Sequence, residues 1–441
     1  MQHTDISRRT FMNSSMGMAV AATSGALLSA GAGTALAQAP PAMPTLANVS
    51  VSVSDEAFWG KVAAQYQIAP GIVNLENGYY GIMTQSVMAE YQRNIEKLNL
   101  NNSHYLRTFY DAETEKITAQ IAKLAGVLPE EIAITRGATE ALQNLITNYK
   151  PLKPGDVAMY ADLDYDSMQF AMNYLKDRRG AKVVTIAMPE PATRQGILDA
   201  YAAAFAAHPS TKLLLLTHIS HRTGMVMPIA EISAMAKAKN IDVIVDAAHS
   251  WGQMDFQIPD LNVDFAGFNL HKWMGAPLGV GFMYIRKNRL GDIERVFADE
   301  DWDATDIRSR VHSGTTNTAN VMTVPTALAL HTQLGAANKQ ARLRYLRDYW
   351  VSRVKGFDGL SILTPQEAGS YGALTSFRLK GKTTKVQNVA IANELRDKYK
   401  IFTVRRGGLA GGDCVRVTTA LFTKPSDLDQ LVAALKTITA S

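Results

Sequence analysis

Short apolar runs alternate with helix-like segments through most of the chain. The runs lack the regular polar positions of a one-sided sheet, as expected for strands that are buried on both faces. We predict a short strand from Ile132, further strands at Val157–Ala161, Lys182–Ala187, Leu213–Thr217, Ile241–Asp246, Val263–Asn269 and Gly279–Ile285, and helices at Gly196–Ala207 and Ile229–Lys239. Such alternation is typical of a mostly parallel sheet with helices on both faces, so the predicted fold class is α/β.

The pattern changes beyond Phe357, where a long helical stretch ends. The segments that follow are predicted strands at Ser361–Leu363, Ala373–Leu379, Phe402–Val404 and Cys414–Thr418, and helices at Val386–Lys398 and Ser426–Lys436. We therefore predict a large domain over residues 55–350 and a small α/β domain over residues 351–441, on which some N-terminal residues also pack. Glu56–Gln67 is helix-like, and the aromatic segment Ser103–Tyr110 is expected to be a loop between helices.

Composition limits the classes of protein to which the chain can belong. The chain has 441 residues, of which 47% are hydrophobic and 19% charged, which is ordinary for a soluble globular protein with full cores. The formal net charge of +5 comes from scattered residues and not from a basic run, so nucleic acid is not expected as a partner. The histidines show no Cys/His ligand spacing, and no metal site is expected.

The N-terminal segment has the features of an export signal. The sequence SRRTFM at 7–12 precedes a weakly apolar run rich in Ala, Gly and Ser, which ends in the cleavage motif ALA at 35–37. This arrangement predicts a twin-arginine signal over residues 1–37 and a linker over residues 38–54. Gly and Ser break the run too often to favour a membrane anchor. We expect the twin-arginine translocase to export the folded protein to the periplasm, where the single cysteine, Cys414, excludes an intrachain disulfide.

An acid and a lysine stand at the carboxyl ends of two predicted strands. Asp246 ends one strand, and Lys272 follows just past the end of the next. Open α/β sheets bind their ligands in the crevice at that edge. Pyridoxal phosphate (PLP) needs such a pair: a lysine for its Schiff base, and a carboxylate that keeps its pyridinium nitrogen protonated. Alone, Asp246 is explained as a helix cap and Lys272 as a surface lysine, but together they favour a PLP site.

The sequence around these two residues resembles one family. Asp246 begins the segment DAAH, and Lys272 lies in the segment NLHKW. With these motifs the chain resembles the class V aminotransferases, most closely the isopenicillin N epimerase-like branch, over nearly all of the predicted mature chain. The resemblance implies fold type I of the PLP-dependent transferases, with PLP on Lys272 and against Asp246. It also implies a homodimer with shared active sites.

The segment ITRGATE at 134–140 is a candidate phosphate cradle. A short strand, a glycine turn and a helix start present free backbone N–H groups and the positive end of a helix dipole. The motif is weak by itself, but in the family it holds the cofactor phosphate. The resemblance therefore assigns Ala138 and Thr139 to that role, and it implies further phosphate contacts from Asn269 and His271.

Other cofactor contacts also follow from the resemblance. Tyr165 occupies the position whose aromatic ring stacks on PLP, and His249 is close enough to meet that ring or its acid partner. The Gly-Thr segment that contains Thr315 reaches across the dimer interface to the neighbour's phosphate. His221 stands where the family commonly has an asparagine that contacts the phenolic oxygen. Either the imidazole of His221 or the charge of Arg222 fills that role.

Candidate substrate-binding arginines lie near the C-terminus. Arg416 resembles the arginine that grips a substrate α-carboxylate bidentately, a task that lysine performs poorly. The alternative is an edge-strand charge without a ligand. Arg405 and Arg406 are further candidates for binding a second acidic group.

The glycine-punctuated segment NLENGYYG at 74–81 is a second candidate for substrate contact. It is either an ordinary turn or the loop that borders the substrate pocket in the family. The resemblance assigns Asn77 and Tyr79 to that pocket. The substrate is expected to be an amino acid or a peptide.

The chemistry common to the family has Lys272 act as general base at the substrate Cα, with a pKa that its cationic, partly buried site lowers. Which bond breaks is left open among epimerisation, transamination and elimination. Export favours a secreted metabolite or peptide as substrate, and exported enzymes that tailor a peptide siderophore of the pyoverdine type look similar. Cysteine desulfurisation is disfavoured because it needs a mobile loop cysteine, whereas Cys414 lies on a predicted strand.

Two functions from other classes serve as alternatives. A PLP-fold protein that only binds a ligand is disfavoured by the intact set of Lys272, Asp246 and Arg416. A nicotinamide dehydrogenase is disfavoured because no G-x-G-x-x-G motif follows the early strands.

Overall fold

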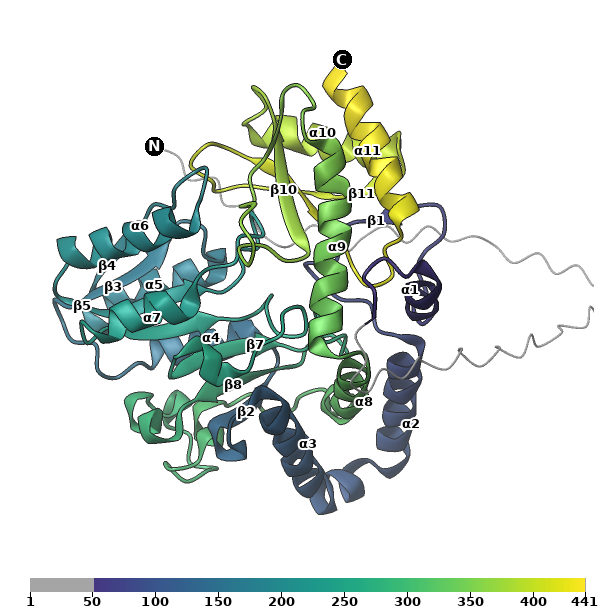
Figure 1. Ribbon diagram of the computed structural model, residues 1–441. Coiled ribbons are helices and arrows are strands. Elements are labelled where there is room, and N and C mark those ends of the chain that lie inside the picture. The colour runs from purple at the N-terminus through teal and green to yellow at the C-terminus, as the bar shows by residue number, and fades with distance from the viewer. Residues whose placement is uncertain (1–50, 441) are drawn as a thin grey trace, which may run out of the picture. The chain divides into compact units, whose positions relative to one another are not determined.

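A seven-stranded sheet forms the centre of the computed structural model, which describes residues 51–440 (Figure 1). In sheet order its strands are β2 (Ile132–Thr135), β8 (Gly281–Ile285), β7 (Phe265–Asn269), β6 (Asp242–Asp246), β5 (Thr211–Thr217), β3 (Val157–Ala161) and β4 (Lys182–Ile186). Neighbours are parallel except where β8 meets β2 and β7. The predicted mostly parallel sheet is confirmed, and the fully bounded strand predictions are right to within about two residues at each end.

Helices cover both faces of this sheet because side chains along each strand alternate between two cores. Leu213 and Leu215 of β5 belong to one core, and Leu214 and Leu216 belong to the other. The helices of the first core are α4 (Ala138–Thr147) and α5 (Asp166–Arg179). The helices of the second core are α3 (Tyr110–Ala125), α6 (Arg194–Ala207), α7 (Ile229–Lys237) and α8 (Thr318–Leu334). Burial on both faces explains the unbroken apolar runs in the sequence.

A second, antiparallel sheet with its own core lies in the C-terminal part. Its strands, in order, are β12 (Val404–Arg406), β13 (Cys414–Thr418), β10 (Leu374–Leu379) and β9 (Leu360–Ile362). The helices packed on it are α9 (Ala336–Val354), α10 (Lys385–Asp397) and α11 (Pro425–Ala440). Figure 1 shows α9, in green, leading from α8 up to this layer. β1 (Val73–Asn74) pairs in parallel with β11 (Ile401–Phe402), so an N-terminal segment joins this part of the fold.

Three predictions of local structure were wrong. Most of the aromatic segment 103–110 is helical: it forms the end of α2 (Gln85–Thr108), after a kink at Asn102, and its Tyr105 is buried. Only Phe109 separates α2 from α3. The long helical stretch is divided into α8 and α9 by Gly335, which adopts a φ of 79°. The strand predicted at Phe402–Val404 is two strands, β11 and β12, on either side of Thr403.

The remaining elements are short. They are α1 (Glu56–Ala63) and the 3-10 turns η1 (Pro129–Glu131), η2 (Ile258–Leu261), η3 (Lys287–Asp292), η4 (Val296–Ala298) and η5 (Ile307–Arg310). Among residues 51–440, none of the helices combines the length and the apolar character that a membrane crossing requires. The predicted signal at 1–37 and most of the predicted linker lie outside the described residues.

Candidate active site

Polar residues gather at the carboxyl ends of β6 and β7. Asp246 is the last residue of β6 and is 3% exposed, and Asn269 is the last residue of β7. Asp246 is in register with Thr217 of β5 and Gly267 of β7, so these strands end at one edge of the sheet. This edge opens into a cavity of about 590 Å³ that Lys272 also lines. A cavity of that size is in the range of cofactor pockets.

The amine of Lys272 lies in this cavity next to His249. Lys272 Nζ is 3.0 Å from His249 Nε2. Burial, opposed by Asp246 and assisted by Arg416 and Arg406, lowers the pKa of Lys272 to about 7. Burial and the Lys272 charge hold the pKa of His249 well below its usual value, so the imidazole is neutral. Near neutral pH the amine therefore has a large uncharged fraction, which is the form that acts as a nucleophile.

The carboxylate of Asp246 faces the same cavity. Its Oδ1 accepts a hydrogen bond from the N–H of Ala248 at 2.9 Å. Burial raises the pKa of Asp246, and both this hydrogen bond and the charge of Lys272 act in the opposite direction. A cationic group placed against Asp246 would stabilise its ionised form further.

The N-terminus of α4 lies at the other end of the cavity. The helix begins at Ala138, and its N-cap residue, Gly137, has no side chain with which to cap the first turn. The N–H of Ala138 donates to Oδ1 of Asn269 at 2.8 Å, so this donor positions Asn269 and is not free for an anion. Thr139, the next residue, lines the cavity together with His271. The phosphate cradle predicted from the sequence is thus changed in one respect: Thr139, and not the Ala138 amide, is available to a ligand.

Two aromatic rings form one wall of the cavity. The rings of Tyr165 and His221 meet edge to face with centroids 5.1 Å apart. Burial, followed by the charge of Arg222, holds the pKa of His221 well below its usual value. Arg222 itself donates to Asp166 and to the carbonyl of Gly407, and it does not line the cavity. Of the two sequence candidates for the phenolic-oxygen contact, only His221 therefore faces the site.

Near Arg416 the cavity is bordered by an acid for which the sequence indicates no role. Arg416 is fully buried and donates through Nη2 to both carboxylate oxygens of Glu76, at 2.5 and 2.8 Å. Asn77 is buried and donates to the carbonyl of Thr418 at 3.0 Å, which fixes the loop against β13. Tyr79 lines the cavity but is 53% exposed.

Two other sequence candidates lie outside this cavity. Thr315 is exposed and is not among the described residues that line the cavity. Arg405 donates to Asp413 through Nε at 2.5 Å, and Arg406, its neighbour in β12, is the one that lines the cavity. The alternation of side chains along a strand explains why these adjacent arginines point in different directions.

Comparison with known proteins identifies the family. The model of the family described as aminotransferase class-V matches residues 82–430. The chain belongs to the class-V aminotransferase family. It is 24% identical over 399 residues to isopenicillin N epimerase from Streptomyces clavuligerus, covering 87% of this chain and 99% of that protein.

Solved structures share the fold of this class-V family member. The cysteine desulfurase CsdA from Escherichia coli superposes with a TM-score of 0.72 at 21% identity, covering 86% of this chain and 97% of that chain. A mutant of C-DES with glycine covalently linked to its PLP cofactor gives a TM-score of 0.71 at 20% identity, with coverage of 83% and 97%. The predicted fold type I is thereby confirmed.

The class-V family is PLP-dependent, and the cavity fits that cofactor. A lysine amine, a buried carboxylate and a helix N-terminus with Thr139 in its first turn are the groups that suit the aldehyde, the pyridine nitrogen and the phosphate of PLP. His249 Nδ1 and His221 Nδ1 are buried without a partner among the described residues, so both are available to a ligand. Lys272, Asp246 and Thr139 are the residues that would hold the cofactor.

Two buried charged groups near the site were not predicted from the sequence. Asp164 is 2% exposed, accepts from the N–H of Ala161 at 2.7 Å, and has a pKa that burial raises to about 7. Lys339, on α9, has a pKa that burial lowers to about 7. The sequence carried no signal for either group, because burial of a charged residue depends on contacts between distant segments.

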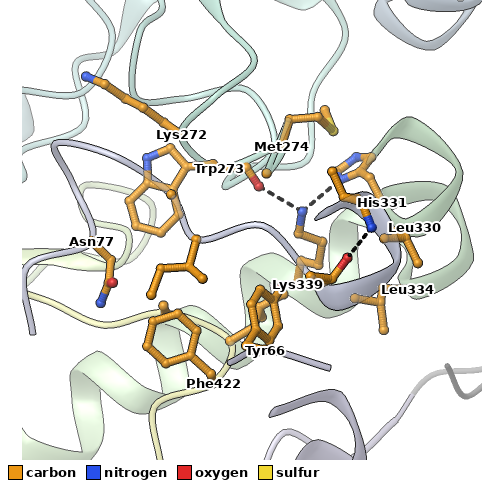
Figure 2. Close-up of a pocket in the computed structure, with 18 of the residues that line it drawn as sticks. Tyr66, Asn77, Lys272, Trp273, Met274, Leu330, His331, Leu334, Lys339 and Phe422 are labelled. Atoms are coloured by element: carbon orange, nitrogen blue, oxygen red, sulfur yellow. Dashed lines mark hydrogen bonds between the residues drawn. The ribbon is translucent and has the colours of Figure 1, made fainter. Parts of the chain in front are cut away.

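Lys339 supports the backbone of the Lys272 loop from a second, smaller cavity (Figure 2). Its Nζ donates to the carbonyl of Trp273 at 3.1 Å and lies 3.0 Å from Nδ1 of His331, as the dashed lines in Figure 2 show. The side chain of Lys272 points away from this cavity. A buried amine from α9 thus fixes the peptide that directly follows Lys272.

Lys339→Met is expected to change the pH dependence of stability. The folded-state pKa of Lys339 is below its unfolded value, so the unfolded chain binds more protons between pH 7 and about pH 10.4. The free energy of unfolding of the wild type, relative to the variant, should therefore rise by about 2–3 kcal/mol from pH 7 to pH 9.5. Urea unfolding at both pH values measures this difference. A difference that is the same at both values, as expected for the exposed control Lys355→Met, would contradict the assignment.

Gly137→Ala is expected to weaken cofactor binding. Gly137 adopts a φ of 152°, and a Cβ at this position would lie 2.9 Å from Oδ1 of Asn269. Relief of that contact displaces Asn269 and the first turn of α4, so the affinity for PLP should fall about tenfold or more, with about 1–3 kcal/mol lost in stability. Fluorescence titration of the cofactor-free protein with PLP measures the affinity. Gly155→Ala, at a positive φ in open space, is the matched control for backbone strain alone.

Proposed function

We propose that this protein is an exported PLP-dependent enzyme that acts at Cα of an amino-acid or peptide substrate, in the manner of an isopenicillin N epimerase. The observation that carries the proposal is the position of Lys272: its amine, with a pKa of about 7, lies 3.0 Å from the neutral His249. The same cavity contains Asp246 and the start of α4.

Different residues of the cavity have different roles in such a reaction. When bound, PLP supplies an electron sink for the bond that breaks at Cα. Asp246 keeps the pyridine nitrogen protonated, and Thr139 with the first turn of α4 orients the phosphate. Lys272 would hold the cofactor, and its amine would move the proton at Cα. His249 positions the Lys272 amine through its Nε2.

The buried thiol argues against desulfurisation of cysteine. Cys414 belongs to the apolar core and is 0% exposed. Burial raises the pKa of its thiol to about 11, so the reactive thiolate is scarce at neutral pH. A persulfide-accepting cysteine needs the opposite properties, namely exposure on a mobile loop and a low pKa.

Whether the enzyme epimerises or transaminates its substrate determines which class of substrate it uses. The match to isopenicillin N epimerase over nearly its whole length supports epimerisation. The SRRTFM motif at 7–12 supports periplasmic export, and with it the second candidate, an aminotransferase or lyase that tailors a secreted siderophore peptide.

The test is made on the purified mature protein. An absorption band near the visible edge, fixed to a Lys272 peptide by borohydride, would establish the cofactor attachment. Incubation with amino acids and short peptides in D₂O then separates the branches. Epimerisation gives inverted Cα with deuterium. Transamination gives an oxo acid with its side chain intact and no free ammonia, whereas elimination gives an oxo acid, free ammonia and the lost side-chain group. A protein that stays colourless after addition of PLP would refute the proposal, and would leave a fold that only binds a ligand.

We also propose a homodimer in which Thr315 contacts the neighbour's cofactor phosphate. The exposure of Thr315 and its place outside the cavity of its own chain support this role. Sedimentation equilibrium measures the oligomeric state, and a monomer that binds PLP tightly would contradict the proposal.

A further inference from the structure

Arg222 is a buried cation to which the proposed reaction assigns no role. Its side chain is 6% exposed, and its Nε is buried without a partner within residues 51–440. Nη2 donates to Oδ1 of Asp166, and Nη1 donates to the carbonyl of Gly407. One guanidinium therefore joins two segments that are far apart in the sequence.

Each of these two partners stands next to a residue of the cavity wall. Asp166 is the first residue of α5 and directly follows Tyr165, which lines the cavity. Gly407 directly follows Arg406, the last residue of β12, which also lines the cavity. Arg222 thus connects the aromatic wall of the cavity with the wall that contains Arg406.

Close packing leaves the Arg222 side chain and its backbone little freedom to move. Gly408 adopts a φ of 84°, and a Cβ at this position would lie 1.4 Å from Arg222 Nη1. The carbonyl of Arg222 accepts from Oγ of Ser376, on β10, at 2.6 Å. Gly224 packs on the same strand, because a Cβ there would lie 2.1 Å from the carbonyl oxygen of Leu374. The turn after β5 is therefore fixed to the C-terminal sheet.

Stability alone is a weak explanation for this buried arginine. Removal of a guanidinium from water is costly, and full compensation requires a partner for each donor and an acid that is also buried. Here Nε has no partner in the described part of the chain, and the side chain of Asp166 is 60% exposed. An ion pair with an exposed acid contributes little to stability. The geometry that Arg222 imposes on its two neighbours is the better explanation.

We propose that Arg222 is a positioning residue of the active site. Through Asp166 it sets the Tyr165 ring beside the bound cofactor, and through Gly407 it holds Arg406 at the cavity. The inference rests on the proposed function, because it concerns the cofactor of the same site. Loss of Arg222 should therefore change how the cofactor is held, and not only how stable the fold is.

Arg342 provides a closely matched control. Its side chain is 1% exposed, and it donates to a partly exposed acid, Glu56, and to the backbone carbonyl of Val53. Its Nε is likewise buried without a partner among the described residues. Arg342 lies on α9 and is not one of the described residues that line the cavity. Arg342→Met therefore removes an ion pair of the same kind away from the cofactor.

The test titrates the cofactor-free wild type, Arg222→Met and Arg342→Met with PLP and follows the protein fluorescence. Arg222→Met should weaken the affinity for PLP by about five- to tenfold, as expected for the loss of one well-placed aromatic contact. Arg342→Met should stay within about twofold of the wild type, because it shares no contact with the site. The circular dichroism of the bound cofactor, divided by its absorbance, should decrease in Arg222→Met alone.

Asp166→Asn tests the connection to the Tyr165 ring. If Arg222 acts through Asp166, the double variant should bind PLP within about twofold of Arg222→Met alone. Losses of affinity that multiply in the double variant would overturn the proposal. If Arg222→Met does not fold, Asp166→Asn decides the question, because its position is largely exposed. An unchanged PLP affinity and dichroism in Asp166→Asn would then overturn the proposal.

The absorption spectrum of the wild type keeps this inference separate from the proposed function. A wild type that gains no cofactor band from PLP refutes the proposed function. A normal wild-type band, together with unchanged PLP affinity and dichroism in Arg222→Met, refutes only the inference. Equal losses of PLP affinity in Arg222→Met and Arg342→Met also refute only the inference, since they would show a role in stability alone.

Discussion

Lys272→Ala is expected to lose both the cofactor band and the activity of the enzyme. The amine of Lys272 is proposed as the attachment point of PLP and as the base at Cα, and no other lysine of the described chain lines the cavity. Loss of the proton transfer alone should reduce kcat by roughly 10²–10⁴-fold. Single-turnover assays, together with mass spectrometry of the borohydride-reduced protein, measure the two effects.

The matched control is Lys287→Ala, because Lys287 is 66% exposed and pairs only with the surface residue Glu130. It should keep the band and the activity of the wild type. A Lys272→Ala protein that retains a borohydride-reducible band, or that keeps more than about a tenth of kcat, would place the cofactor on another residue.

Asp246→Asn is expected to reduce kcat by roughly 10²–10³-fold while PLP stays covalently attached. The amide has nearly the same shape and can keep the hydrogen bond from Ala248, but it has no charge with which to hold a proton on the pyridine nitrogen. The cofactor would then be a poorer electron sink. Pre-steady-state measurement of proton loss from Cα, made with deuterated substrate, tests the step directly.

Asp255→Asn is the control, since Asp255 is exposed and lies outside the cavity. If Asp246→Asn slows the reaction less than about threefold, the carboxylate does not act on the pyridine nitrogen and serves only to anchor the loop at Ala248.

Local sequence patterns were sufficient for the elements that depend on contacts repeated along the chain. Runs such as Leu213–Leu216 are apolar at every position because each residue faces one of two cores, and this pattern indicates a central strand without knowledge of its neighbours. Where the local structure depends on a single contact, the sequence pattern predicted the wrong element. The segment around Tyr105 was expected to be a loop, yet burial of that ring keeps it helical.

The candidate site shows the same difference between local sequence patterns and tertiary contacts. The order of strands and the DAAH and NLHKW motifs were enough to place Asp246 and Lys272 at one edge of the sheet, because the carboxyl ends of parallel strands must meet there. Tertiary structure alone decided which neighbours these residues have. It placed the Ala138 amide on Asn269, Glu76 on Arg416, and Lys339 beneath the Lys272 loop.

The sequence by itself thus determined the fold class, the family and the residue types of the site, since these depend on periodicity and on short motifs. The tertiary structure decided which charges are compensated and which are available to a ligand. The charge state of a group depends on burial and on partners from distant segments, as Glu76 and Arg416 show across 340 positions. That dependence on long-range contacts is why the sequence alone did not show that the arginine of the family motif is paired with Glu76.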